Sequence, residues 1–204
     1  MARLRLGILI SGRGSNLQAL IDACAAPDFP ATVALVISNK AEAAGLDRAR
    51  AAAILTRVIS HREPDFEPDF EAAMDAALRD AGVELVCLAG FMRILGAGFV
   101  NGWRDRLINI HPSLLPAFPG LGTHRRALAA GMTVTGCTVH FVRSEVDAGP
   151  IILRETVPVL PGDTEASLAE RVLAAENRLY PAAVRQVAEM LANDGGSAIS
   201  LRRN

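Results

Sequence analysis

The sequence lacks the features of a membrane protein, a disulfide-rich secreted protein and a nucleic-acid binder. No apolar run approaches the roughly 18 residues of a membrane-spanning helix. The formal charge of the 204 residues is only -1, so no basic surface for nucleic acid or anionic lipid is indicated. The three cysteines are widely spaced, without a CxxC pair, and offer no disulfide framework. A reducing, cytoplasmic compartment is therefore expected.

One domain is expected from the length and composition. Half of the residues are apolar, which is ample for one core. The first apolar run, at residues 6–10, is too short for a signal peptide and leads directly into a glycine turn. A single domain is predicted over residues 1–192. Residues 193–204 are polar and contain glycine, which predicts a poorly ordered tail.

Apolar segments alternate with helical segments along the chain. Compact apolar runs, typical of buried parallel strands, occur at residues 5–10, 33–38, 54–59, 83–89 and 107–111. Two further β-runs, 134–142 and 151–159, are joined by a short turn, which favours an antiparallel pair. The pattern predicts an α/β protein with a Rossmann-like, open, mostly parallel but mixed sheet and helices on both faces.

The longest predicted helix lies near the end of the chain. It follows Asp163 and Thr164, which are suitable capping residues, and its apolar residues recur at helical spacing. Proline lacks the N–H that a helix interior needs. An interruption is therefore predicted at Tyr180-Pro181, with a second helix reaching Leu191.

A glycine turn follows the first predicted strand. Residues 11–16, SGRGSN, precede a helical pattern, so free N–H groups at the helix start can bind an anion. The turn lacks the third glycine of a dinucleotide fingerprint, since Leu17 stands there, and it lacks a Walker Gly-Lys-Ser/Thr. The prediction is a single phosphate on the backbone of Gly14, Ser15 and Asn16. A β–α turn without a ligand is the alternative.

Asn109 and His111 mark a second candidate site. In a strand at 107–111 both side chains point to one face, and Pro112 ends the strand. Such a pair at a strand end is typical of ligand sites in open α/β sheets, although a buried structural pair has the same pattern. Asp147, in a turn at another strand end, can orient His111. With Asn109 as an oxyanion donor and no obvious nucleophile, the set favours transfer between two bound substrates.

Two other sites can be built from the same residues. Ser113, His111 and Asp147 could form a hydrolase triad, but Ser113 lies outside a Gly-x-Ser-x-Gly elbow. His111, His140 and Asp147 could ligate a metal, but they match no short ligand motif, and no metal is predicted.

The segment GFMRIL at 90–95 directly follows a predicted strand. It mixes apolar side chains with one arginine, a composition that can line a pocket for a flat aromatic ligand. An ordinary loop anchored in the core is the alternative.

Six motifs occur in the order of one known family. They are SGRGSNLQAL, LAGFMRIL, NIHPSLLPAFPG, TVHFV, VDAGPII and GDTEASLAERVLAAENRLYP, and they extend from about residue 5 to about residue 187. Together they resemble the phosphoribosylglycinamide formyltransferases, also called glycinamide ribonucleotide transformylases, of purine biosynthesis. The resemblance implies an enzyme that transfers the formyl group of 10-formyltetrahydrofolate to the amine of 5-phosphoribosylglycinamide, without a metal.

The resemblance also implies residue roles. Asn109, His111 and Asp147 match the catalytic trio, in which Asn109 and protonated His111 stabilise the oxyanion and Asp147 holds His111. The 14–16 turn matches the phosphate loop, and Glu176 matches the residue that contacts the ribose. The residues that match the folate pocket are Arg62, Met92, Arg93, Ile94, Leu95, Val100 and His140.

Some features depart from the family or leave alternatives. Asn177 stands where a histidine commonly follows the glutamate, and Gly122 stands where a polar residue is usual. Methionyl-tRNA formyltransferases carry a further C-terminal domain, for which this chain is too short. Formyltetrahydrofolate deformylase, normally with an N-terminal regulatory domain, is the alternative enzyme, and a phosphoribosyl-binding module without activity is the alternative from another class. Small-molecule substrates are expected, with no nucleic-acid or membrane partner, in a monomer or homodimer.

Overall fold

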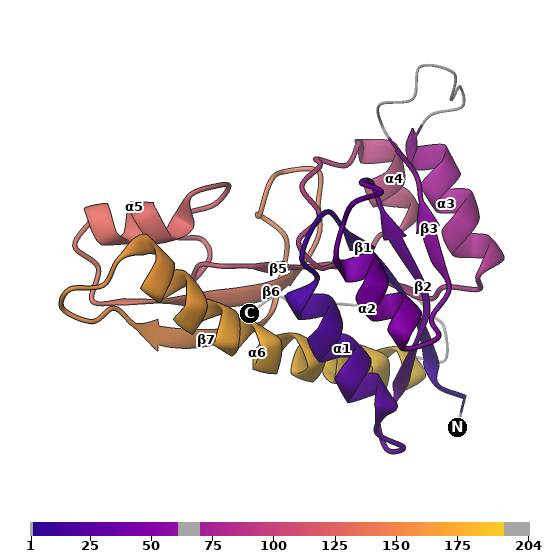
Figure 1. The fold of residues 1–204 in the computed structure, drawn as a ribbon. Helices are drawn as coiled ribbons and strands as arrows, with labels where there is room; N and C mark the ends of the chain where they lie inside the picture. The colour runs from indigo at the N-terminus through magenta and orange to yellow at the C-terminus, as the bar shows by residue number, and fades with distance from the viewer. Residues whose placement is uncertain (1, 61–69, 194–204) are drawn as a thin grey trace.

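The computed structural model describes residues 2–60 and 70–193. Within these residues, strands form a seven-stranded sheet in the order β3-β2-β1-β4-β5-β6-β7 (Figure 1). The strands are β1 (Leu4–Ile10), β2 (Ala31–Ser38), β3 (Thr56–Val58), β4 (Leu85–Leu88), β5 (Leu107–His111), β6 (Val134–Phe141) and β7 (Ile151–Pro158). Strands β1 to β5 are parallel, whereas β6 is antiparallel to both β5 and β7. The predicted mostly parallel, mixed sheet is confirmed.

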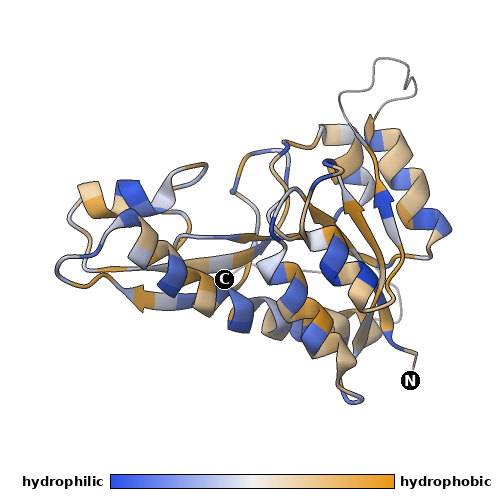
Figure 2. Cartoon of the chain, viewed as in Figure 1, coloured by the Kyte–Doolittle hydropathy of each residue, from blue (hydrophilic) through white to orange (hydrophobic). Residues whose placement is uncertain are grey.

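Helices cover both faces of the sheet, as predicted. They are α1 (Ser15–Ala25), α2 (Gly45–Ala51), α3 (Phe70–Asp80), α4 (Ala97–Gly102), α5 (Thr123–Ala129) and α6 (Glu165–Asn193). The central strands are mostly hydrophobic, while the helices carry residues of both kinds (Figure 2). This difference follows from burial of the strands on both faces, whereas each helix buries only one side.

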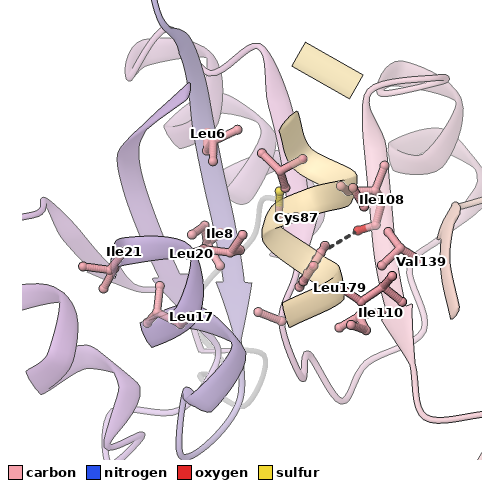
Figure 3. Packing of buried hydrophobic residues seen from close by; sticks show 14 of the residues in the cluster. Leu6, Ile8, Leu17, Leu20, Ile21, Cys87, Ile108, Ile110, Val139 and Leu179 are labelled. Atoms are coloured by element: carbon pink, nitrogen blue, oxygen red, sulfur yellow. Dashed lines mark hydrogen bonds between the residues drawn. The ribbon is translucent and has the colours of Figure 1, made fainter. Parts of the chain in front are cut away.

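One core cluster joins the sheet to α1, α2 and α6. Leu6 and Ile8 of β1 face Leu17 and Leu20 of α1, and Leu179 of α6 packs into the same cluster (Figure 3). The alternation of β1 side chains sends its intervening residue Leu9 to the opposite face.

A second core cluster lies on that opposite face. Leu9 packs there with Met74 and Leu78 of α3, Phe99 of α4 and Leu107 of β5. Each face of the sheet therefore has its own helices and its own buried side chains.

The long C-terminal helix is continuous, so the predicted interruption at Tyr180-Pro181 is wrong. Helix α6 runs from Glu165 to Asn193 with Pro181 inside it. Buried residues lie on both sides of the proline, including Tyr180, Ala183 and Val184, and the Tyr180 hydroxyl donates to the carbonyl of Leu88 at 3.0 Å. Packing along the whole helix compensates for the backbone hydrogen bond that proline cannot donate. The predicted capping by Thr164 is confirmed, because its hydroxyl accepts from the Ser167 N–H at 3.2 Å.

The strand order reverses at β1, which pairs with β2 on one side and β4 on the other. The loops that follow the parallel strands β1, β4 and β5 leave the same edge of the sheet, and open α/β sheets bind ligands at this edge. Beyond it, α5, the β6–β7 pair and the first half of α6 extend to one side of the molecule (Figure 1).

No helix in the part of the chain that the structure describes is long and apolar enough to cross a membrane. Of the predicted tail at 193–204, Asn193 is the last residue of α6, and residues 194–204 lie outside the described residues, as does the predicted folate residue Arg62.

Candidate active site

Strand β5 presents Asn109 and His111 on one face, as predicted. Ile108 and Ile110 point to the first core cluster, and Leu107 points to the second. Because side chains alternate, Asn109 and His111 lie on the same face as Leu107. The strand ends at His111, whose side chain is buried.

Both ring nitrogens of His111 face oxygen atoms. Nδ1 lies 3.3 Å from Oδ2 of Asp147, and Nε2 lies 3.0 Å from the carbonyl oxygen of Phe118. Neither a carboxylate nor a carbonyl oxygen donates, so only the protonated ring hydrogen-bonds to both. Burial lowers the pKa of His111, the Phe118 carbonyl and Asp147 counteract this, and the nearby charges of His140 and Arg126 lower it further. The net pKa lies below the usual 6.5.

Asp147 is held as a carboxylate. Its backbone has φ of 54°, a left-handed conformation, and its Oδ2 accepts the Gly120 N–H at 2.8 Å. Its Oδ1 lies 3.6 Å from Nε2 of His140. Burial raises the pKa of Asp147, but hydrogen bonding from His140 and Gly120 and the charges of His111 and His140 outweigh burial and lower it below 3.8.

His140 is a fourth member of this cluster. Its Nδ1 lies 3.0 Å from the Phe141 carbonyl, which can only accept, so Nδ1 carries the proton of the neutral ring. In the neutral ring Nε2 accepts from Nδ2 of Asn109 at 3.2 Å, so Nε2 can donate toward Oδ1 of Asp147 only when the ring is protonated. The sequence placed His140 in the folate pocket or in the alternative metal site, and not beside Asn109. Pairing of Asn109 with His140 across β5 and β6 brings them together, and this register is not readable from either strand alone.

The structure does not favour the two alternative sites. Ser113 is fully buried, and its hydroxyl donates to the Ala117 carbonyl at 2.6 Å, so it is not placed as a nucleophile. Among residues 2–60 and 70–193, no group of three or more His, Cys, Asp or Glu side chains has an arrangement that could hold a metal ion.

The glycine turn and α6 carry the residues that were predicted to bind a nucleotide, and the structure brings Asn16 and Glu176 together. Gly14 has φ of 73°, and a Cβ on it would lie 2.7 Å from Cα of Gly45, so both the conformation and the space require glycine. Helix α1 starts at Ser15, which leaves its first N–H groups without partners inside the helix. Nδ2 of Asn16 donates to Oε2 of Glu176 at 2.8 Å across 160 residues of sequence. Burial raises the pKa of Glu176 despite this hydrogen bond.

The predicted folate residues divide into an exposed and a buried group. Met92 and Ile94 are 64% and 81% exposed, and Arg93 is exposed as well. Leu95 and Val100 are buried in the second core cluster, beneath the loop. A hydrogen bond joins the loop after β4 to the loop after β1, since the Met92 N–H donates to Oγ of Ser11 at 2.8 Å.

Sequence reasoning missed the contribution of the loop after Pro116. The Phe118 carbonyl and the Gly120 N–H contact His111 and Asp147. Both are backbone groups that every non-proline residue carries, so no residue type could have revealed them.

Acid should destabilise the protein partly through His111. Its folded pKa is lowered, so the unfolded chain takes up the proton first, and the stability present above about pH 6.5 declines as pH falls. We expect the free energy of urea unfolding to decrease between about pH 8 and about pH 5.5, and less steeply in His111→Gln. His124, whose pKa is also lowered by burial, adds to the decline in both proteins. Equal slopes for the two proteins would contradict the assignment.

These features define a class of protein, an α/β protein with an open sheet, a glycine turn at the switch point of the sheet, and a polar set of Asn109, His111 and Asp147 beside it. Of this set His111 is buried and the other two are half-buried, an arrangement that suits a transferase. The chain belongs to the formyl transferase family, whose model matches residues 4–184.

Relatives agree over most of the chain. The phosphoribosylglycinamide formyltransferase of Escherichia coli (strain K12) is 45% identical over 186 residues, which are 91% of this chain and 88% of that protein. The human trifunctional purine biosynthetic protein adenosine-3 is 54% identical over 91% of this chain, but the chain spans only 18% of that protein's length. The crystal structure of glycinamide ribonucleotide transformylase 1 from Symbiobacterium toebii is similar with a TM-score of 0.88 and 50% identity, covering 92% of this chain and 88% of that one. The resemblance carried by the six motifs is confirmed.

Proposed function

We propose that this protein transfers the formyl group of 10-formyltetrahydrofolate to the amine of 5-phosphoribosylglycinamide in purine biosynthesis. The observation that carries the proposal is the connected set Asn109–His140–Asp147–His111, which offers polar donors and a carboxylate but no hydroxyl or thiol nucleophile. The relatives that bear the name of this activity support it.

The proposed chemistry needs no covalent enzyme intermediate. The substrate amine attacks the formyl carbon, a C–N bond forms, and the carbonyl electrons move to oxygen. Asn109 and protonated His111 donate to that oxyanion, an interaction worth about 3–4 kcal/mol of barrier per donor. The bond to N10 of the folate then breaks. One proton leaves the amine nitrogen and one reaches N10, and Asp147 with His111 assists this movement.

The present partners of the two proposed oxyanion donors indicate which hydrogen bonds must change during the reaction. Nε2 of His111 donates to the Phe118 carbonyl, and Nδ2 of Asn109 donates to His140. Both donors therefore have to exchange or share these partners with the substrate oxygen. The carboxylate of Asp147 beside the ring counteracts part of the burial that disfavours the imidazolium, although the net pKa of His111 stays lowered.

The nucleotide is proposed to lie across α1 and α6. The phosphate binds the free N–H groups of Ser15 and Asn16, and Glu176 accepts hydrogen bonds from the ribose. The folate is proposed to lie beside Met92 and Ile94, whose apolar side chains are exposed.

Ser15→Pro should weaken binding of 5-phosphoribosylglycinamide by about tenfold or more, because it deletes one N–H donor to a charged group. Ser15 is the first residue of α1, a position where proline is tolerated. Isothermal titration calorimetry measures the effect, and urea unfolding checks the fold. Ser15→Ala, which keeps the N–H, is the matched control and should bind within about twofold of the unaltered protein. Equal affinity for Ser15→Pro would place the phosphate elsewhere.

A direct assay tests the function. The purified protein is incubated with 10-formyltetrahydrofolate, with and without 5-phosphoribosylglycinamide, and tetrahydrofolate release is followed together with the formylated product. We expect consumption only when the amine is present. Consumption that ignores the amine would identify a deformylase, and binding of the nucleotide without turnover would identify a binding module.

A further inference from the structure

We propose that Arg126 is a positioning residue for His111 and Asp147, and that it acts through the segment 118–121, here called the 118–121 loop. The catalytic consequence rests on the proposed function, whereas the structural part does not.

The 118–121 loop is the common partner of both site residues. The Phe118 carbonyl accepts from Nε2 of His111 at 3.0 Å, and the Gly120 N–H donates to Oδ2 of Asp147 at 2.8 Å. That oxygen of Asp147 is also the one that faces Nδ1 of His111 at 3.3 Å. Loop, imidazole and carboxylate thus form a closed ring of contacts, so a shift of the loop must alter both side chains together.

The loop conformation needs support from outside. Phe118 has φ of 53° and Gly120 has φ of 75°. A left-handed phenylalanine is strained, and such a residue persists only when its surroundings hold it.

Arg126 of α5 supplies that support. Its Nη1 donates to the Pro119 carbonyl at 2.5 Å and to the Leu121 carbonyl at 3.4 Å. Its guanidinium carbon lies 5.4 Å from the centroid of the Phe118 ring. One side chain therefore contacts three of the four loop residues, those on either side of Gly120 included. An arginine combines hydrogen-bond donors with a face that stacks on an aromatic ring, which lysine does less well.

The charge of Arg126 also acts near the imidazole. The charged groups that influence the pKa of His111 are Asp147 from the turn before β7, His140 from β6 and Arg126 from α5. His111 in turn lowers the pKa of His124 on α5. Loss of the guanidinium removes a positive charge that disfavours protonation of His111. Loss of the Phe118 contact removes a hydrogen bond that favours protonation, so the two effects on the pKa of His111 oppose each other. The main measurements are therefore the exchange of the Gly120 amide and kcat, and the titration of His111 is a secondary one.

The experiment compares Arg126→Ala with Arg125→Ala. The second variant removes the same charge from the preceding residue of α5, which is also exposed. Amide hydrogen exchange of Gly120 and the ring signals of His111 are measured by NMR on the ligand-free protein, and kcat and KM by the transfer assay. In Arg126→Ala we expect Gly120 exchange to accelerate by about tenfold or more. We expect kcat to fall by about tenfold or more, with both KM values within about threefold.

Arg126→Lys tests the chemistry of the contact and covers the case of a poorly folded alanine variant. It keeps a charged donor but loses the stacking face on Phe118, so Gly120 protection and kcat should lie between those of Arg126→Ala and those of the unaltered protein. Arg125→Ala should match the unaltered protein in every measurement, including the pH at which His111 titrates, whereas Arg126→Ala should shift that pH.

Three results would overturn the proposal. They are unchanged Gly120 exchange and kcat in Arg126→Ala, equal losses in the two alanine variants, and a raised KM with unchanged kcat, which would make Arg126 a substrate contact. Absence of formyl transfer in the unaltered protein would refute the proposed function instead. The Gly120 and His111 signals would then still decide whether Arg126 holds the loop.

Discussion

His111→Ala is expected to reduce kcat for formyl transfer by about a thousandfold or more, because it removes an oxyanion donor and the group that moves the proton. The imidazole is the centre of the site, with Asp147 on one nitrogen and the Phe118 carbonyl on the other. Steady-state kinetics at saturating concentrations of both substrates measures the effect.

Nucleotide binding is the control for this variant. The proposed phosphate and ribose contacts come from Ser15, Asn16 and Glu176, on α1 and α6. We expect affinity for 5-phosphoribosylglycinamide to stay within about tenfold, since these contacts do not involve His111. Turnover retained in His111→Ala would refute the catalytic role, and lost binding with normal kcat would place His111 in the nucleotide site.

Gly149→Ala is expected to destabilise the protein by about 3 kcal/mol, at the upper end of the usual cost of overpacking. A Cβ at this position would lie 1.7 Å from the Phe141 carbonyl oxygen, which is a backbone atom and cannot swing away. That oxygen also accepts a hydrogen bond from Nδ1 of His140, and the other ring nitrogen of His140 contacts Nδ2 of Asn109. Any shift that makes room for the methyl group therefore disturbs the site, and kcat should fall as well.

Gly98→Ala is the matched control. It makes the same change in α4, at a glycine with nothing within 4 Å of the added Cβ. There alanine should be neutral or stabilising by up to about 1 kcal/mol, since it favours a helix over glycine. Urea unfolding compares the two variants. Equal stability of Gly149→Ala and the unaltered protein would show that the turn relaxes without cost.

Local pattern was enough to predict the strands, the glycine turn before the first helix and the orientation of Asn109 and His111. Strand alternation and the left-handed turn at Gly14 are properties of a few adjacent residues. The same local reasoning was wrong at Pro181, because the cost of a proline is local whereas the burial that outweighs it comes from the rest of the core.

The motifs implied that Asn16 and Glu176 share a ligand, but no local pattern relates residues so far apart. Only α1 packing beside α6 brings Nδ2 and Oε2 to 2.8 Å. His140 is similar, since its place beside Asn109 depends on the register of β6 against β5. Register is a property of the two strands together, and here a long connection that contains α5 separates them in the sequence.

By itself the sequence determined the fold class, the family and the chemical types of the site residues, because these depend on periodicity, glycine positions and motif order. The tertiary structure alone decided which partners those residues have. It set the Phe118 carbonyl on His111, the Gly120 N–H on Asp147 and Arg126 on the loop between them. In all three contacts the loop contributes a backbone atom. Backbone atoms are nearly the same in every residue, so only their position in space gives them a role.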